Sequence, residues 1–276
     1  MHRSSDCSSA RWDCGPAFVT HQPLPEETRL SIDRYRVAAV SGASRGIGAA
    51  IVRALRLRGL EVHALARDAA ALAGLAAECG AVAHVVDVTD RAAVAACLAA
   101  HEVDIVICNA AALGPVQPVY DAAPDEIAPT LQTNIAGVLN LLAATVPGMR
   151  ARGRGHIVTL TSLAAVQTVP GMPLYGMTKG ALHTMTGSLR LDLHGSGVRV
   201  SEIAPGRVRT GIHLEMLADR AAAQQHFYDG YDCLEPHDIA DAVLFVLNAP
   251  QRMDVTFMEI LPTDQVAGGS QFFRRG

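Results

Sequence analysis

The sequence predicts an α/β fold: one doubly wound parallel seven-stranded sheet with helices on both faces. From Tyr35 onward, short apolar runs alternate with longer stretches of helical periodicity. The strand-like runs are apolar throughout rather than alternating, which is typical of parallel strands covered on both faces. The chain has 276 residues, half of them hydrophobic, so a large core can form. No repeat or linker divides residues 35–276, which we expect to form one Rossmann-type domain.

The sequence of the first half of this domain predicts four strands and three helices. The strands are short aliphatic runs at 36–41, 61–66, 83–86 and 103–108. A helix at 46–58 opens on a glycine-rich turn, and an Ala/Leu-rich helix occupies 68–79. Thr89 or Asp90 caps a third helix that runs to about residue 101, since short polar side chains are favoured before the first helical turn.

The second half continues the same alternation. A long helix covers roughly 125–149, and Pro129 lies near its start, where proline is better tolerated than in a helix interior. Strands follow at 156–161, 199–203 and 256–260. Helices are expected at 174–193 and 236–247.

Residues 1–34 differ from the remainder. They are polar, contain three prolines and lack the apolar run of a signal peptide. We expect a mostly disordered tail, with a docking arm as the alternative reading. No transmembrane helix is expected, because the apolar runs are of strand length, and a cytoplasmic location is therefore expected.

Charge and cysteine usage exclude further classes. A net charge of −4 argues against a nucleic-acid binder, which usually carries a basic domain. The six cysteines are scattered without a C-x-x-C pair, so neither a disulfide framework nor a metal site is predicted, and a reducing compartment fits.

A glycine-rich turn after the first strand predicts a dinucleotide site. The segment 41–48 reads SGASRGIG and opens a helix. Glycines permit a tight turn and close backbone approach, and a helix N-terminus offers free N–H groups to a pyrophosphate. The residues expected to bind cofactor here are Gly42, Ser44, Arg45, Gly46, Ile47 and Gly48.

The end of the second strand predicts NADP(H) rather than NAD(H). An NAD enzyme usually carries a carboxylate there for the ribose hydroxyls. This chain has Ala66 followed by Arg67, and Arg45 lies in the glycine-rich turn. Two guanidinium groups would suit a 2′-phosphate through charge-assisted hydrogen bonds; the alternative is two surface arginines.

Strand ends further along the chain supply more of this site. Asp87, beside Val88, is expected to accept a hydrogen bond from the adenine amino group, or else to cap the next helix. Asn109, followed by Ala110, is expected to fix backbone beside the cofactor. Ligands of doubly wound sheets bind beyond the carboxyl ends of the strands, where these residues lie.

Tyr175 and Lys179 indicate the chemistry. Residues four apart share one helix face, so the phenol and ammonium can point into one site. A nearby positive charge favours the phenolate and so lowers a tyrosine pKa. Tyr175 is therefore expected to exchange a proton with a carbonyl or alcohol oxygen, which the Ser162 hydroxyl could hold.

Together these motifs resemble the short-chain dehydrogenase/reductases, over about residues 36–269. The matching pieces include CNAA at 108–111, YGMTK at 175–179 and PG at 205–206, and the segments 189–205 and 253–268 resemble NADP-dependent 3-hydroxy acid and serine 3-dehydrogenases. The resemblance implies a catalytic tetrad of Asn134, Ser162, Tyr175 and Lys179. It also implies that Lys179 holds the nicotinamide ribose and that Asn134 holds a water in a proton relay.

The loop after the sixth strand is implied to complete the cofactor site. By resemblance, Thr210 reaches the nicotinamide carboxamide, while Pro205, Gly206 and Val208 shape the loop; a helix cap is the alternative for Thr210. Two departures stand out, Cys108 and Ala111, which replace the asparagine and glycine usual in the family.

The substrate pocket is where the sequence is least specific. Hydride transfer between nicotinamide and a carbonyl carbon is implied, with a small hydroxy acid or semialdehyde as substrate, or a more hydrophobic ketone or 3-oxoacyl group as the alternative. A non-catalytic dinucleotide sensor is the competing class. A homodimer or homotetramer is implied by the family. Pocket residues are expected to be Leu113, Leu163, Met172, Arg207, Arg209, His213 and Met216.

Overall fold

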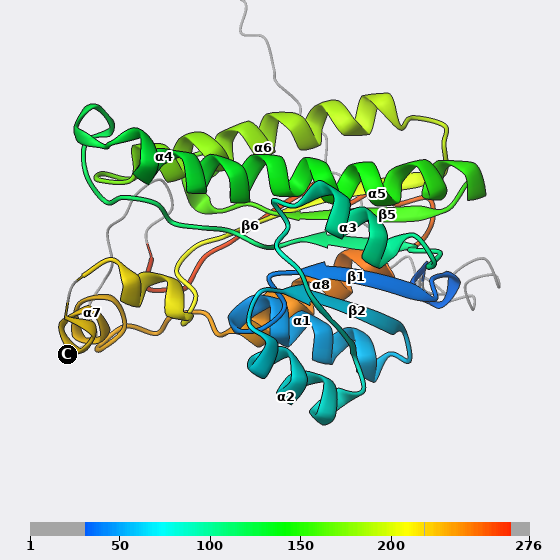
Figure 1. Cartoon of the computed structure of the whole chain (residues 1–276), viewed down its shortest axis with the longest axis horizontal. Coiled ribbons are helices and arrows are strands. Elements are labelled where there is room, and N and C mark those ends of the chain that lie inside the picture. Colours follow the sequence, from blue (N-terminus) through cyan, green and yellow to red (C-terminus); the bar gives the residue numbers. More distant parts are fainter. Residues whose placement is uncertain (1–30, 218, 266–276) are drawn as a thin grey trace, which may run out of the picture.

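All seven strands of the computed structural model lie in one parallel sheet of order β3-β2-β1-β4-β5-β6-β7. The structure describes residues 31–217 and 219–265. The strand order reverses between β1 and β4, so the carboxyl ends of these two strands diverge and leave a crevice. The predicted Rossmann-type fold is confirmed (Figure 1).

The first half of the chain builds the β3 edge of the sheet. Its strands are β1 (Val37–Ser41), β2 (Glu61–Ala66), β3 (Val82–Val85) and β4 (Ile105–Cys108). Its helices are α1 (Gly46–Leu57), α2 (Ala69–Cys79) and α3 (Arg91–Leu98). Asp68 and Asp90 cap α2 and α3 by accepting from backbone N–H groups at 3.0 Å. Helix α3 ends three residues earlier than expected, in a turn where His101 N–H donates to Leu98 O.

The second half builds the other edge. Its strands are β5 (Gly155–Leu160), β6 (Val198–Pro205) and β7 (Phe257–Ile260), and its helices are α4 (Pro124–Leu131), α5 (Gly137–Arg152), α6 (Pro173–Asp192), α7 (Arg220–Phe227) and α8 (Pro236–Asn248). Helix α7 was not expected, because its mostly polar and alanine-rich sequence gives no clear apolar stripe. A π-helical turn, Gln132–Ala136, joins α4 to α5.

Two apolar layers hold the helices on the sheet. Helices α1, α2 and α8 cover one face, where Ile51, Leu55 and Val243 are fully buried. Helices α3, α5 and α6 cover the other face, where Leu141 and Met149 are almost fully buried. Truncating such a side chain to alanine costs about 2–5 kcal/mol, so these layers fix the strand ends firmly.

The short 3₁₀ helix Ser31–Arg34 lies at the start of the described chain. Ile32 in this turn is buried in the same layer as α8, and Tyr35 is buried beside it. These last residues of the segment expected to be a tail therefore pack on the domain. Residues 1–30 of that segment lie outside the described residues.

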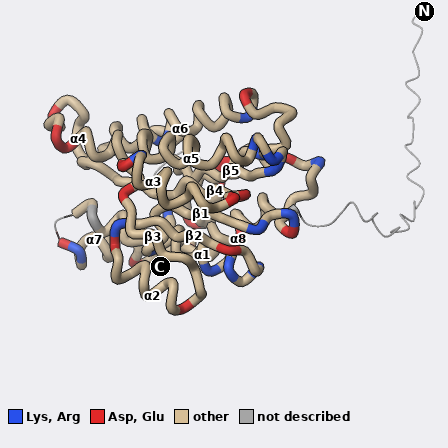
Figure 2. Tube along the Cα trace, turned by 45° about the vertical axis from the view of Figure 1, so that its right-hand side comes forward, with Lys and Arg blue, Asp and Glu red and all other residues tan. Residues whose placement is uncertain are grey.

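The continuous helix Pro124–Arg152 is long and apolar enough to cross a membrane by length and composition alone. Its sheet-facing residues Leu141 and Met149 are buried in the second apolar layer, as in a core helix. Between Gly137 and Met149 it carries no charged residue, and the trace is uncharged there (Figure 2).

Candidate active site

A cavity of about 920 Å³ opens beyond the carboxyl ends of the strands. The glycine-rich turn, the ends of β2 and β3, helix α6 and the loop after β6 all contribute to its wall. The predicted residues on the wall are Gly42, Ser44, Arg45, Gly46, Ile47, Arg67, Asp87, Val88, Asn109, Ala110, Leu113, Ser162, Leu163, Met172, Tyr175, Lys179, Pro205, Gly206, Arg207, Val208, Thr210, His213 and Met216. Gly48, Asn134 and Arg209 are not on the wall.

The glycine-rich turn passes so close to neighbouring backbone that two of its positions have no room for a side chain. Gly42 has a φ of +62°, and a Cβ added there would lie 2.8 Å from Ala110 Cα, so only glycine fits. A Cβ on Gly48 would overlap the Gly42 carbonyl oxygen. Asn109 secures the turn by donating from Nδ2 to the carbonyls of Ser41 and Gly42 at 2.9 and 3.2 Å.

The ends of β2 and β3 carry one cation and one carboxylate. Arg67 is 78% exposed, and its Nη1 lies 3.8 Å from Asp87 Oδ2. Asp87 also accepts from Thr89 N–H at 2.9 Å, whereas Asp90 is the residue that caps α3. Arg45 lies elsewhere on the wall: its Nη1 is 3.9 Å from a Cβ added to Gly211. Both predicted arginines therefore lie on the cavity wall, Arg67 beside Asp87 and Arg45 near Gly211.

Ser162, Tyr175 and Lys179 come together on one wall of the cavity. Ser162 follows β5, and its hydroxyl accepts from Ala164 N–H at 3.2 Å and lies close enough to the Tyr175 hydroxyl to lower the Tyr175 pKa. Lys179 lies one turn after Tyr175 on α6, and its Nζ is 5.6 Å from the centre of the Tyr175 ring. Nζ donates to Leu160 O at 2.9 Å, which holds the ammonium at the end of β5.

Burial decides the protonation of this pair. It raises the pKa of Tyr175 to about 12, and the nearby Ser162 hydroxyl only partly opposes that rise. Burial also lowers the pKa of Lys179 to about 8, while Cys108 and Glu202 raise it. The net shift of the Tyr175 pKa is therefore opposite in direction to the predicted one, because desolvation by burial is its largest cause. Tyr175 is a protonated acid at neutral pH.

Asn134 is fully buried in the π-helical turn behind this wall. Its Oδ1 accepts from Ala112 N–H at 2.7 Å, and its Nδ2 donates to Ala112 O and to Thr178 Oγ1 at 2.9 and 3.0 Å. Thr178 Oγ1 donates in turn to Tyr175 O at 2.8 Å. The Asn134 side chain thus ties the loop after β4 to helix α6, and its bonds are all used within the protein.

The loop after β6 forms the opposite wall. Thr210 precedes the short helix Gly211–Glu215, but its side chain makes no cap hydrogen bond, so the capping alternative is not realised. The Tyr228 hydroxyl donates to Thr210 O. The Gln265 side chain accepts from Arg207 N–H at 2.9 Å and lies close to Gly206.

The cationic residues of this loop differ in their surroundings. Arg207 lies on the cavity wall, 5.3 Å from the Phe227 ring and 5.8 Å from the Tyr231 ring. Burial, aided by the charge of Arg207, lowers the pKa of His213 to about 4, so this imidazole is neutral and bonds the Tyr228 hydroxyl at 3.0 Å. Arg209 points away to Glu235, 2.8 Å distant. Of the three residues expected to attract a carboxylate, Arg207 and His213 lie on the cavity wall and Arg209 does not.

The residues present fit a dinucleotide. Gly42 and Gly46 of the glycine-rich turn line the cavity, and the turn leads into α1, whose first residues Gly46 and Ile47 are on the cavity wall. A helix N-terminus offers free N–H groups to a pyrophosphate. The cavity is continuous from Arg67 and Asp87 at one end to Ser162 and Tyr175 at the other.

Comparison with known proteins identifies the family. The sequence model of the short chain dehydrogenases matches residues 36–221. The chain is a short-chain dehydrogenase/reductase. It is 37% identical to an uncharacterized short-chain type dehydrogenase/reductase of Sinorhizobium fredii over 240 residues, which is 87% of this chain and 96% of that protein. It is 30% identical to an NADP-dependent 3-hydroxy acid dehydrogenase of Salmonella typhi, covering 86% of this chain and 99% of the relative.

A solved structure agrees with this assignment. The closed form of a serine dehydrogenase complexed with NADP+ superposes with a TM-score of 0.80, at 30% identity, over 87% of this chain and all of that chain. The predicted resemblance to the 3-hydroxy acid and serine dehydrogenase branch is confirmed, and so is the assignment as an oxidoreductase.

Some residues that shape the dehydrogenase/reductase site were not predicted. Tyr228 and Gln265 hold the loop after β6. Tyr228 bonds Thr210, 18 residues earlier in the chain, and Gln265 bonds Arg207, 58 residues earlier. Glu202, buried on β6, accepts from Thr161 Oγ1 at 2.7 Å and lies 2.9 Å from His183 Nδ1. The only signal for Glu202 in the sequence is that it is the single acid of strand β6; the other two contacts depend on tertiary folding.

Proposed function

We propose that the protein interconverts a carbonyl compound and its alcohol with NADP(H), with Tyr175 as the proton donor and acceptor. The supporting observation is that Ser162, Tyr175 and Lys179 line the same cavity as the glycine-rich turn, with the Lys179 ammonium 5.6 Å from the centre of the Tyr175 ring. The three groups lie where a substrate oxygen can meet both hydroxyls.

In the proposed mechanism, the cofactor supplies or accepts the hydride. Ser162 hydrogen-bonds the substrate oxygen and aligns it with the Tyr175 hydroxyl. During reduction Tyr175 gives its proton to that oxygen. Lys179 stabilises the phenolate that remains, because a positive charge beside the ring lowers the free energy of the anion.

The proton lost by Tyr175 has to be replaced from solvent. We propose that Lys179 takes part in this step and that a water held at the Gln132–Ala136 turn completes the path. Because the side chain of Asn134 already bonds Ala112 and Thr178, the backbone of this turn is the part that can hold the water. Asn134 is then a positioning residue that keeps the π-helical turn against α6.

NADP(H) is the proposed preference over NAD(H). Ala66 stands where a ribose-binding carboxylate would repel a 2′-phosphate, and Arg67 follows on the cavity wall. Asp87, at the same end of the cavity, is proposed to accept a hydrogen bond from the adenine amino group. Thr210 and Val208, on the opposite wall, are proposed to contact the nicotinamide carboxamide.

A small carboxylate-bearing substrate is proposed, namely a 3-hydroxy acid or the matching semialdehyde. Arg207 is the observation that favours it: a largely buried guanidinium on the substrate wall attracts an anion strongly, because solvent screens it little. Leu113, Leu163, Met172 and Met216 supply the apolar remainder of the wall. A hydrophobic ketone or 3-oxoacyl substrate would fill this apolar part without using Arg207.

The test is NADPH oxidation over a panel of carbonyls: malonate semialdehyde, sulfoacetaldehyde, a β-keto ester and a hydrophobic ketone. Turnover of the first two over the others would support the proposal. Tyr175→Phe should lower kcat about 10³-fold while NADPH still binds, because the variant lacks only the proton. Preference for the neutral ketones would overturn the substrate assignment, and NADPH binding without turnover of any carbonyl would indicate a sensor.

A homodimer or homotetramer is also proposed. The uncharged stretch of α5 exposes Leu139 by 48%, and α8 exposes Phe245 by 54%. Apolar helix surfaces of this kind are commonly covered by a second subunit. Sedimentation at micromolar concentration would reveal it, and a monomer would reject it. The proposed location is the cytoplasm.

A further inference from the structure

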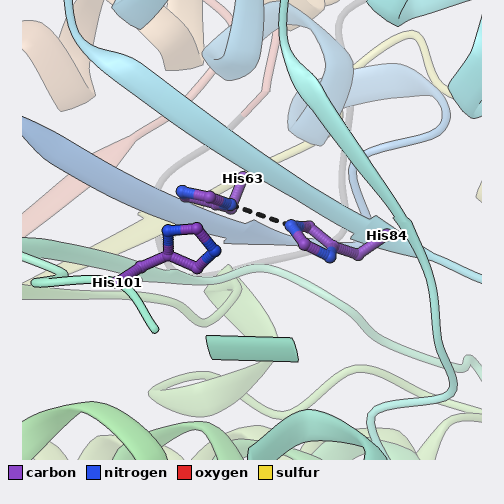
Figure 3. A group of neighbouring side chains, drawn as sticks. All are labelled: His63, His84 and His101. Atoms are coloured by element: carbon purple, nitrogen blue, oxygen red, sulfur yellow. Dashed lines mark hydrogen bonds between the residues drawn. The ribbon is translucent and has the colours of Figure 1, made fainter. Parts of the chain in front are cut away.

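Three histidines lie close together on the β2–β3 side of the sheet, outside the cavity that contains Ser162, Tyr175 and Lys179. His63 is on β2, His84 on β3, and His101 in the turn between α3 and β4. One ligand nitrogen from each lies within 4.8 Å of the other two. Figure 3 shows the three rings turned toward a common point, although they come from positions 21 and 17 residues apart in the sequence.

The geometry points to a site for a borderline divalent cation, and we propose Zn²⁺ bound by His63, His84 and His101. Imidazole nitrogen is a preferred ligand of zinc, and three protein nitrogens plus a water or carboxylate complete a tetrahedron. Ligand nitrogens around such an ion lie about 3.4 Å apart. His63 Nδ1 and His84 Nε2 are now 2.8 Å apart, so they need to separate only slightly to share an ion in place of a proton.

Glu61 provides the outer partner that metal-binding histidines usually have. Its Oε1 lies 2.9 Å from His63 Nε2, so a proton on that nitrogen leaves the lone pair of Nδ1 facing His84. The same oxygen is 3.8 Å from His101 Nδ1. The carboxylate therefore orients the His63 ring and adds a negative charge beside the proposed cation.

The cluster is buried at one end and open at the other. Burial lowers the pKa of His63 and His84, which favours the neutral imidazole that binds a cation. The His63 side chain is fully buried, whereas His101 is 31% exposed, which leaves an entry path at the surface. Such a pocket can be loaded in the folded protein.

Binding would join three separate segments. Strand β3 is the edge strand of the sheet, and most of its residues are exposed. An ion on His63, His84 and His101 would fasten β3 to β2 and to the turn before β4. A ligand that binds only the folded form raises its stability, so the ion should act as a clamp on this edge.

The experiment uses the full chain without a histidine tag, first stripped of metal with a chelator. Zn²⁺ is then titrated into the protein in competition with a chromophoric chelator. We expect one high-affinity ion per chain. His84→Gln and His101→Gln should each weaken it by at least about tenfold, and Glu61→Gln by about tenfold. His194→Gln, an exposed histidine after α6, is the matched control and should change nothing.

Two further measurements separate a lost site from a misfolded variant. Zinc at about 100 times its dissociation constant should raise the Tm of the wild type by about 5 °C and that of the His84→Gln/His101→Gln double variant by much less. Cobalt should give the visible bands of a tetrahedral site only where the histidines remain. NADPH binding by both proteins verifies the fold. Equal zinc affinity in the wild type and the folded double variant would overturn the proposal.

Discussion

The two walls of the cavity differ in how they are held. The catalytic wall is part of the main core: Lys179 and Thr178 are buried, Lys179 bonds the end of β5, and Asn134 fixes α6 from behind. The opposite wall, residues 207–231, packs around a small cluster of its own that contains Phe227, Tyr228 and Cys233. It is tied to the main core by Val208, which is buried in the same layer as α1 and α8, and by individual hydrogen bonds such as that from Arg207 N–H to Gln265.

This difference separates the reaction from the choice of substrate. A change in the catalytic wall disturbs the layers that hold the whole sheet, so the proton-transfer groups are constrained. The opposite wall, which we call the lid wall, can be mutated with little effect on the main core, because its own small cluster buries only a few side chains. The two walls should therefore respond to mutation in different ways.

The largest effect is expected on the catalytic wall, from Lys179→Met. Methionine keeps a long unbranched side chain but removes the charge that stabilises the Tyr175 phenolate. We expect kcat to fall about 10³-fold at saturating NADPH, since positioned proton-transfer groups contribute on that scale. Steady-state NADPH oxidation measures it.

Ser188→Ala is the control on the same helix, because Ser188 is exposed and bonds only Thr184 O at 3.2 Å. It should retain full turnover. If Lys179→Met, saturated with NADPH, keeps wild-type kcat, the role given to the ammonium is wrong.

On the lid wall, Arg207→Gln should act on specificity rather than on the chemistry. We expect kcat/KM for a carboxylate substrate to fall about 10²-fold, because an anion loses its buried charged partner. The value for a neutral ketone should change little. Arg209→Gln provides the matched control, since Arg209 pairs with Glu235 outside the cavity. Equal losses for charged and neutral substrates would show that Arg207 acts only on the fold of the lid.

The same contrast explains what the sequence could predict. The strands were predictable, because continuous apolar runs are a local signal. The Tyr175/Lys179 spacing is also local, and it correctly placed both residues on one wall of the cavity. The lid wall was less predictable. Helix α7 has a weak apolar stripe, and the outward turn of Arg209 depends on Glu235, 26 residues along the chain. The protonation of His213 and Tyr175 was also beyond local reasoning, because burial sets both pKa values.

The His63, His84 and His101 cluster shows the limit in another way. No short-range spacing relates these residues, and they belong to no cysteine-containing metal motif. The register of β2 with β3 pairs Leu65 with His84, and this places His84 diagonally opposite His63. Only the assembled sheet brings the rings together.

The pH dependence of reduction would sharpen the account of the catalytic wall. Lys179, with a pKa of about 8, loses its proton as pH rises, well before Tyr175 with a pKa of about 12. Carbonyl reduction should therefore be fastest below the Lys179 pKa. At saturating NADPH, kcat should fall about tenfold between about pH 7 and about pH 9.

The chain itself makes this pKa directly measurable. Lys179 is the only lysine in the sequence, so isotopic labelling of lysine gives a single side-chain signal in NMR. That signal should titrate near the same pH as kcat. A lysine that titrates near its ordinary value of about 10.4 would contradict the effect assigned to burial.

The smallest effect is expected at the far end of the cavity, from Arg67→Ala. Arg67 is 78% exposed, so water and salt screen its attraction for a 2′-phosphate. We expect the KM for NADPH to rise about fivefold at low ionic strength, while the KM for NADH is unchanged, and the difference should shrink as salt is added. Arg53→Ala is the control, because Arg53 is an exposed arginine of α1 that pairs with Glu78 away from the cavity. An equal rise for NADPH and NADH would assign Arg67 to the shape of the site, and a wild-type preference for NADH would remove the basis for NADP(H) selection at Ala66 and Arg67.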